Sequence, residues 1–122
     1  MRKLLLLSAV LFAYAGTALA GEARQDFKLV NKTGYDISEV YVSPSKKDEW
    51  GDDVLGDDDG LDDGNTVNIR FKNAGKICKW DLKVVYDEDD SSAVWNEIDL
   101  CEVSKVTIFY NRKSDKTSAS FE

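Results

Sequence analysis

Alternation between apolar and polar side chains over residues 78–86 constrains the fold more than any other feature of the sequence. Every second position from Cys78 to Tyr86 is apolar, and lysine or aspartate fills positions 79, 81 and 83. A period of two is the repeat of a β-strand, in which successive side chains point to opposite faces of a sheet. The segment therefore predicts a strand with one buried and one solvated face, as in antiparallel sheets.

Five further segments predict strands. They are rich in β-branched and aromatic residues, and polar or glycine-containing turns separate them. We expect these strands near residues 27–29, 37–43, 67–71, 93–100 and 103–110. The prediction is an all-β fold, a small antiparallel β-sandwich of about six strands that forms a single domain over residues 21–110. Residues 111–122 are polar and predict a frayed C-terminal tail.

The longest connection, from Pro44 to Gly64, interrupts the strand pattern. Ser45 is a suitable N-cap for a helix, and Asp48 and Glu49 would lie in its first turn, where negative charge is favoured. We therefore expect one short helical turn in this long acidic loop.

The register of the hairpin around residues 87–92 can be tested against burial. Placing the two cysteines opposite each other sets Trp80 against Asp99, which mixes buried with solvated side chains. A shift of one residue sets Trp80 against Ile98 and suits burial better. A β-bulge near Leu100 would reconcile the two pairings, because it adds one residue to one strand.

The first 20 residues have the organisation of a secretory signal peptide. Arg2 and Lys3 precede an apolar run over residues 4–15, and Ala-Leu-Ala at 18–20 supplies the small side chains of a cleavage site. We predict that residues 1–20 are a signal peptide and that the mature protein is periplasmic or secreted. The apolar run is too short to cross a bilayer, so we expect no membrane span in the mature chain. A retained N-terminal anchor is the alternative.

The mature chain is strongly acidic. Loss of the two basic residues of the signal leaves 14 basic and 23 acidic side chains, a net charge of −9. Such a chain repels nucleic acid and anionic lipid surfaces. A basic protein, a cation or a neutral glycan would not be repelled. High charge also keeps a small exported protein soluble, which is the simpler interpretation.

Cys78 and Cys101 are the two cysteines of the chain. An exported protein meets oxidising conditions, so they predict one disulfide. A loop of about 24 residues closed in this way stabilises a fold by about 3.4 kcal/mol in the chain-entropy description. A reactive thiol pair is the alternative, but the spacing is not Cys-x-x-Cys and the surroundings are not basic.

Seven aspartates crowd into the thirteen residues 52–64. Clustered carboxylates on a glycine-containing loop suit Ca²⁺, which takes six to eight oxygen ligands. The spacing does not fit an EF-hand loop, because Gly60 at the sixth position would place Leu55 at the first. A solvated charged loop is therefore the main interpretation. Ca²⁺ binding is the alternative, and no other cofactor is expected; the candidate ligands are Asp52, Asp53, Asp57, Asp58, Asp59, Asp62 and Asp63.

Catalysis finds little support in the composition. The chain has no histidine, which removes the commonest general base, the Ser-His and Cys-His nucleophile pairs and most zinc sites. Carboxylate pairs of the glycosidase type remain, but they need a cleft that a domain of this size rarely provides. We predict no catalytic residues and no enzymatic activity.

Aromatic side chains offer a second binding hypothesis. Exposed together on one sheet face, such rings would stack on sugars, and Trp95 is out of phase with Val94 and Ile98, which predicts the outer face. Aromatic residues in small β domains are more often part of the core. The candidate ligand-binding residues are Trp50, Trp95, Tyr35 and Tyr41.

Short motifs are spread over residues 30–108. They are Tyr-Val-Ser-Pro at 41–44, Trp-Gly at 50–51, Leu-Gly at 55–56, Cys78 with Asp-Leu-Lys-Val at 81–84, and Asp-Leu-Cys at 99–101. Together they resemble a family of short exported bacterial proteins. The resemblance implies export and the disulfide but no established activity.

Some members of that family are labelled argininosuccinate lyase. Enzymes of that kind are large helical tetramers with a Ser/Met/Lys loop, and this short chain has no counterpart of the loop. The aspartate run at 57–63 is longer than the family pattern, so metal binding would be particular to this chain.

The sequence thus predicts an exported, non-catalytic binding or structural protein of the cell envelope. Three alternatives remain open. They are a Ca²⁺-stabilised module, an acidic inhibitor of a basic protein through the aspartate-rich loop, and a glycan-binding module.

Overall fold

The computed structural model describes residues 25–47, 49–56, 60–71 and 74–122, and the described residues form seven strands and no helix. The predicted signal peptide lies outside them. In chain order the strands are β1 (Phe27–Lys32), β2 (Ile37–Pro44), β3 (Thr66–Ile69), β4 (Lys79–Tyr86), β5 (Ser92–Asp99), β6 (Lys105–Asn111) and β7 (Lys116–Phe121).

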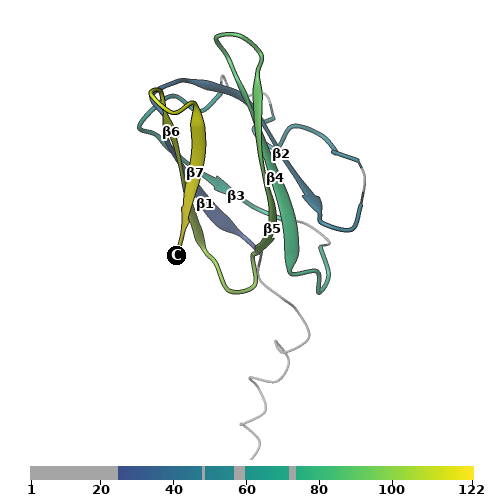
Figure 1. Ribbon diagram of the computed structural model, residues 1–122. Helices are drawn as coiled ribbons and strands as arrows, with labels where there is room; N and C mark the ends of the chain where they lie inside the picture. Colours follow the sequence, from purple (N-terminus) through teal and green to yellow (C-terminus); the bar gives the residue numbers. More distant parts are fainter. Residues whose placement is uncertain (1–24, 48, 57–59, 72–73) are drawn as a thin grey trace, which may run out of the picture.

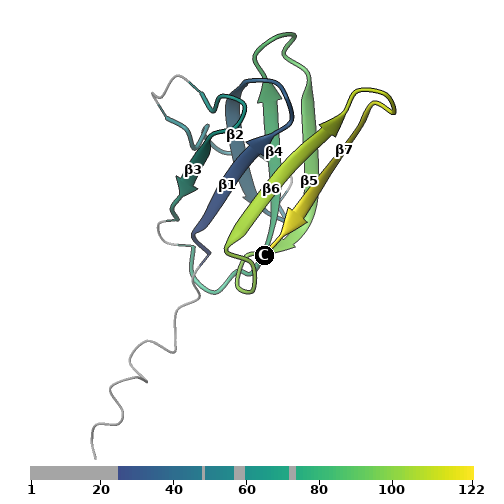
Figure 2. The same ribbon diagram turned by 90° about the vertical axis from the view of Figure 1, so that its left-hand side faces the viewer.

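The strands form two sheets. One has four strands in the order β3-β1-β6-β7, and the other has three in the order β2-β4-β5. Figures 1 and 2 show the two sheets packed face to face. All strand pairs are antiparallel except β1 and β6, which run parallel. The predicted all-β sandwich is therefore confirmed, with seven strands in place of about six.

The core lies between the sheets, and β4 shows how the sequence produces it. Its residues alternate between exposed or half-buried and buried from Lys79 to Tyr86, as the period of two predicts. From the opposite sheet, Leu29, Val106 and Ile108 are fully buried and pack against this face. Burial of these apolar side chains is the main force that holds the two sheets together.

The C-terminal segment corrects the prediction of a frayed tail. Residues 116–121 pair with β6 over six positions, and the backbone of Glu122 makes further hydrogen bonds with Ser104 and Lys105. Backbone pairing does not require apolar side chains, and Ala119 is the residue of β7 that packs on the core. The polar composition marks an edge strand here, not disorder.

The loop after β2 corrects a second prediction. Ser45 does not cap a helix: its backbone N–H donates to the carbonyl oxygen of Lys79, and its hydroxyl donates to Asp81 at 2.7 Å. Further along the loop, Val54 N–H donates to the Val40 carbonyl at 2.7 Å. The loop therefore bonds along the outer edge of β2, which satisfies backbone groups that an edge strand leaves open.

The predicted bulge exists in the β4–β5 pair but lies away from Leu100. Trp80 faces Ile98 as expected, and the register then shifts before Leu82, which faces Trp95. Glu97 takes the extra position with φ of 53°, and its N–H donates to the Asp81 carboxylate at 2.9 Å. The prediction was wrong about the place, because the bulge depends on that carboxylate and not on the cysteine pairing.

A second loop fixes the start of β2. Ile37 and Leu61 exchange two backbone hydrogen bonds of 3.0 and 2.7 Å. Gly60 allows this approach: its φ is +103°, and an added Cβ would lie 2.4 Å from the Ile37 carbonyl oxygen. The buried amide of Asn31 donates to the carbonyl oxygens of Tyr35 and Leu61 at 2.8 and 2.9 Å. These bonds hold Tyr35 in place at the end of the sandwich where β2 begins.

Candidate functional site

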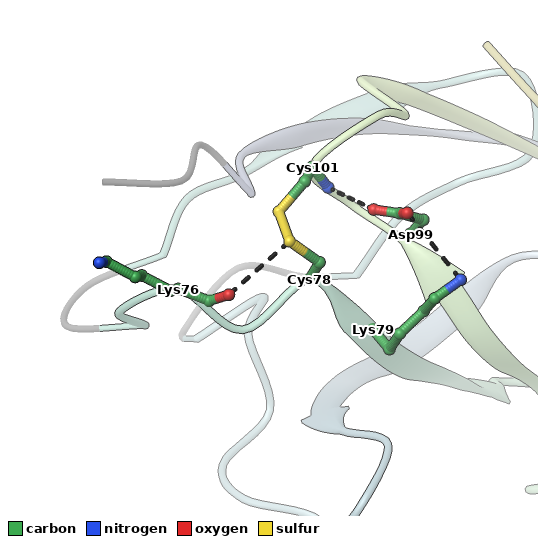
Figure 3. A network of polar contacts seen from close by, with 5 residues as sticks. All are labelled: Lys76, Cys78, Lys79, Asp99 and Cys101. Carbon is green, nitrogen blue, oxygen red and sulfur yellow. Dashed lines mark hydrogen bonds and ion pairs between the residues drawn. A yellow bond between two sulfur atoms is a disulfide. The ribbon is translucent and has the colours of Figure 1, made fainter. Parts of the chain in front are cut away.

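The predicted disulfide is present at one end of the sandwich. Cys78 and Cys101 are bonded, with their Cα atoms 5.1 Å apart, and they join the residue before β4 to the loop after β5. Figure 3 shows the surroundings, in which Asp99 accepts from the backbone N–H of Cys101 at 3.1 Å and forms an ion pair with Lys79 at 3.9 Å. Within the described residues, the one group of three potential metal ligands is Cys78, Asp99 and Cys101. Its two sulfurs are bonded to each other, so the group is a structural link.

Two of the four described aspartates of the long loop form side-chain hydrogen bonds within the fold. One carboxylate oxygen of Asp53 accepts from the backbone N–H groups of Val40 and Leu55 at 2.9 and 3.0 Å. Asp63 accepts from the Gly34 N–H at 2.8 Å. These bonds tie the loop to its neighbours, as aspartates commonly do in turns.

The described part of the proposed calcium site does not converge. Asp52 and Asp62 are exposed, and no three of the four described aspartates bring ligand oxygens together. Residues 57–59, which supply the other three candidate ligands, lie outside the described residues.

The four predicted binding aromatics do not form one platform. Tyr41 and Trp50 lie together, with the Lys83 ammonium 5.1 and 5.5 Å from their ring centroids. Trp95 pairs with the inward-facing Leu82 and packs against the core, because the bulge at Glu97 reverses its phase. The outer-face prediction for Trp95 is therefore wrong.

Tyr35, the fourth of them, lines a cleft at the other end of the sandwich. The cleft has a volume of about 550 Å³ and is lined by residues of the β4–β5 and β6–β7 turns. Both turns lie at the same end of the sandwich (Figure 1). Two more tyrosine rings line it: Tyr86 is the last residue of β4, and Tyr110 lies near the end of β6. The polar residues of this tyrosine cleft come from the two turns and the starts of β5 and β7: Glu88, Asp89, Ser91, Ser92, Asp115 and Thr117.

The three rings of the tyrosine cleft meet at steep angles. The centroids of Tyr35 and Tyr86 are 6.3 Å apart with an interplanar angle of 72°, and those of Tyr35 and Tyr110 are 5.7 Å apart at 65°. Edge-to-face contacts of this kind are favourable and fix the rings relative to one another. The volume falls in the range of small-ligand sites, about 300–1,000 Å³. The tyrosine cleft is therefore a preformed concave site with aromatic walls.

Tyr86 carries an unusual polar atom for a buried position. The residue is only 9% exposed, and its hydroxyl is buried with no hydrogen-bond partner in the described part of the chain. Burial raises the pKa of this hydroxyl above its ordinary value, because the charged phenolate would be poorly solvated there. A buried hydroxyl without a partner costs about 1–3 kcal/mol, so its presence needs an explanation.

The rim of the tyrosine cleft is negatively charged. The Tyr110 hydroxyl donates to Asp115 at 2.6 Å, and this bond is the main cause that raises the pKa of Tyr110 to about 12. Asp89 accepts from the N–H and hydroxyl of Ser91 at 3.0 and 2.7 Å, which lowers the pKa of that carboxyl. Glu88 adds a third carboxylate. The rim therefore places three acidic side chains beside the tyrosine hydroxyls.

Sequence reasoning singled out Tyr35 but missed its two partners. Both fit the pattern of ordinary strand residues, and nothing in the spacing of Tyr86 and Tyr110 shows that each ring contacts Tyr35 in the folded protein. One local feature of the sequence could have indicated Tyr86. It directly precedes the polar turn 87–91, which places its side chain at the end of a strand.

Comparison of the chain with protein-family models, with curated proteins and with solved structures finds no match in any of the three. The resemblance to the family of exported bacterial proteins therefore stays a prediction. Among the described residues, no helix has the length and apolar character needed to cross a membrane. The disulfide is compatible with an oxidising, exported location. The fold and the tyrosine cleft carry the functional argument.

Proposed function

We propose that this protein is an exported, non-catalytic binding protein of the cell envelope whose ligand site is the tyrosine cleft. The observation that carries the proposal is the buried, unpartnered hydroxyl of Tyr86 on a ring that lines the cleft. A ligand that pairs with this hydroxyl recovers a hydrogen bond that the free protein lacks. Such a group costs stability when the site is free and adds affinity when the site is occupied.

A binding role suits the groups around the tyrosine cleft better than a catalytic one. The chain lacks histidine, and Asp89 and Asp115 already accept hydrogen bonds from Ser91 and Tyr110. Both hydroxyls are protonated at neutral pH, because the ordinary tyrosine pKa of 10.0 is already high and is raised further in Tyr86 and Tyr110. These groups are suited to orient a ligand by hydrogen bonds and ring contacts.

The test is an amide-resolved NMR titration of the disulfide-bonded protein. The probes are choline chloride, N-acetyl-arginine amide and N-acetylglucosamine, each at millimolar concentration and low ionic strength. We expect at least one probe to shift the amide signals of Ser92 and Thr117, which line the cleft, and to leave that of Val42 in β2 unchanged. If no probe moves the cleft signals, the proposed site is wrong.

Two matched variants test the role of the hydroxyl. Tyr86→Phe should weaken binding of the responsive probe about fivefold, the worth of one hydrogen bond. Tyr41→Phe removes a hydroxyl that is bonded to Glu39 away from the cleft, and it should leave binding unchanged. Equal effects of the two substitutions would contradict the assignment of Tyr86.

A further inference from the structure

The walls of the tyrosine cleft have the electrostatic character of a cation site. An aromatic ring is negative over its face, so a positive group near that face is attracted to it. Tyr35, Tyr86 and Tyr110 surround one cavity at steep mutual angles, so a single guest can approach more than one ring. Aromatic enclosures of this kind are the usual way in which proteins hold quaternary ammonium groups.

One of these rings already holds a cation. The guanidinium carbon of Arg112 lies 5.0 Å from the centroid of Tyr35. Arg112 is exposed and lies in the turn between β6 and β7, so burial does not force it into this position. The contact is within the distance at which cation–π attraction is effective, about 6 Å. The protein's own side chain thus marks Tyr35 as a ring that accepts a positive group.

Carboxylates surround the same ring on two sides. Glu88, Asp89 and Asp115 line the tyrosine cleft, and Asp36 and Asp87 line a hollow that shares Tyr35 and Glu88 with it. An anionic ligand would be repelled here. A neutral sugar could use the hydroxyls and rings but would gain nothing from the charge, whereas a cation gains from both.

We infer that the tyrosine cleft binds a cationic head group, an alkylammonium or a guanidinium, between its tyrosine rings and its carboxylates. Arg112 lies on the Tyr35 ring but does not line the cleft, and its positive charge opposes this binding from outside. The inference rests on the proposed function, because it names the ligand class of the same site. The head group belongs either to a lysine or arginine side chain of a basic protein or to a small organic cation, and the probes distinguish these sources.

The decisive comparison uses two isosteric probes. N-acetyl-arginine amide and N-acetyl-citrulline amide have nearly the same shape, but only the first is charged. We expect the arginine derivative to shift the signals of Ser92 and Thr117 with at least tenfold higher affinity than the citrulline derivative. We expect added salt to weaken it, because screening reduces the attraction of the carboxylates.

The source of the cation is read from two further probes. The tripeptide Gly-Arg-Gly with blocked ends represents a protein side chain, and choline chloride represents a small organic cation. Tighter binding of the tripeptide assigns the site to a basic protein segment, and tighter binding of choline assigns it to a small quaternary ammonium ligand. Both results support the cationic class.

Substitutions of Tyr35 and Arg112, which contact each other, should change the affinity for the cation in opposite directions. Tyr35→Leu removes the ring and should weaken cation binding five- to tenfold, whereas Tyr35→Phe keeps the ring and should retain it. Arg112→Gln removes the resident cation and should tighten binding two- to fivefold. Tyr41→Leu is the control, because Tyr41 also faces a cation, Lys83, but away from the cleft.

Three outcomes would overturn the inference. They are equal affinity for the arginine and citrulline probes, weaker binding after Arg112→Gln, and a response of the cleft to N-acetylglucosamine but not to either cation. Each of these leaves the cleft as a ligand site. The first and third remove the cationic class, and the second removes the opposing role of Arg112. Silence of the cleft signals with every probe would instead remove the proposed function itself.

Discussion

Each end of β4 packs an aromatic side chain against the core, and one of the two has a hydrogen-bond partner while the other has none among the described residues. At the disulfide end, Trp80 is 7% exposed, and its indole N–H donates to the Ile77 carbonyl at 2.9 Å. At the cleft end, Tyr86 is 9% exposed, and its hydroxyl has no partner among the described residues. The strand and its inner face are the same, so the difference arises from what closes each end.

The disulfide end is closed by local and covalent bonds. Besides the Cys78–Cys101 link, the side-chain amide of Gln25 donates to the carbonyl oxygens of Gly75 and Ile77 at 3.0 and 2.9 Å. The cleft end has two turns with an open volume between them. Proteins place binding sites where structure is left incomplete, and the polar groups there are satisfied by a guest. One end of the sandwich is thus closed by a covalent link and hydrogen bonds, and the other carries the cleft that we propose as the ligand site.

The largest expected effect breaks the closed end. Replacing both cysteines, Cys78→Ser with Cys101→Ser, should lower the free energy of unfolding by about 3 kcal/mol, because the unfolded chain regains the freedom of an open loop. Urea unfolding followed by tryptophan fluorescence measures this loss. Below the transition, probe binding at the distant cleft should persist. A loss of less than about 1 kcal/mol would show that the disulfide end does not depend on its covalent link.

An intermediate effect sharpens the contrast between the two aromatic residues of β4. Trp80→Phe should lower the free energy of unfolding by about 2 kcal/mol, because it leaves a space in the core and removes one of the two hydrogen bonds to the Ile77 carbonyl. Tyr86→Phe should raise it by about 1 kcal/mol, because it removes a buried hydroxyl that has no partner. Equilibrium unfolding of the two variants in parallel gives both values. Destabilisation by Tyr86→Phe would mean that the hydroxyl is already satisfied.

The smallest effect concerns Tyr110, the tyrosine at the cleft end whose hydroxyl has a hydrogen-bond partner. The bond from Tyr110 to Asp115 raises the pKa of Tyr110 from 10.0 to about 12. The bond therefore contributes its full stability below pH 10.0, and this contribution is lost as the pH rises through about 12. Asp115→Asn should return this pKa toward its ordinary value, which the ultraviolet absorbance of tyrosinate measures.

A matched variant controls that titration. Glu39 raises the pKa of Tyr41 to about 12 in the same way, away from the cleft. Glu39→Gln should therefore return the pKa of Tyr41 toward its ordinary value. The variant with both substitutions should lower the pKa values of two tyrosines. If Asp115→Asn leaves the titration unchanged, the bond to Tyr110 does not form in solution.

The β4–β5 bulge separates the residues whose buried face could be predicted from the sequence from those whose face could not. The alternation that places Trp80 and Leu82 on the inner face could be predicted, because the face of each residue follows from its immediate neighbours. Trp95 was misplaced, because one extra residue at Glu97 reverses the phase of everything before it. The carboxylate that supports the bulge, Asp81, comes from the neighbouring strand, and the spacing within β5 does not reveal it.

The C-terminal strand shows the same limit from another side. Residues 116–121 carry too few apolar side chains to predict a strand, yet they complete the four-stranded sheet through backbone bonds to β6. The aspartate-rich loop shows it again. Its composition suggested ligands, whereas Asp53 and Asp63 bind backbone N–H groups of distant segments.

Local pattern determined six of the seven β-strands, the buried face of β4 and the pairing of the chain's two cysteines, since each depends on neighbouring positions or on a count of two. Tertiary structure alone decided where the tyrosine cleft lies, since Tyr35 belongs to the turn between β1 and β2, Tyr86 ends β4 and Tyr110 lies near the end of β6. The three meet only in the folded sandwich. Side-chain alternation specifies which way a residue faces within its own strand. Which strand ends become neighbours is set by the packing of the two sheets as a whole, and that information is spread over the entire core.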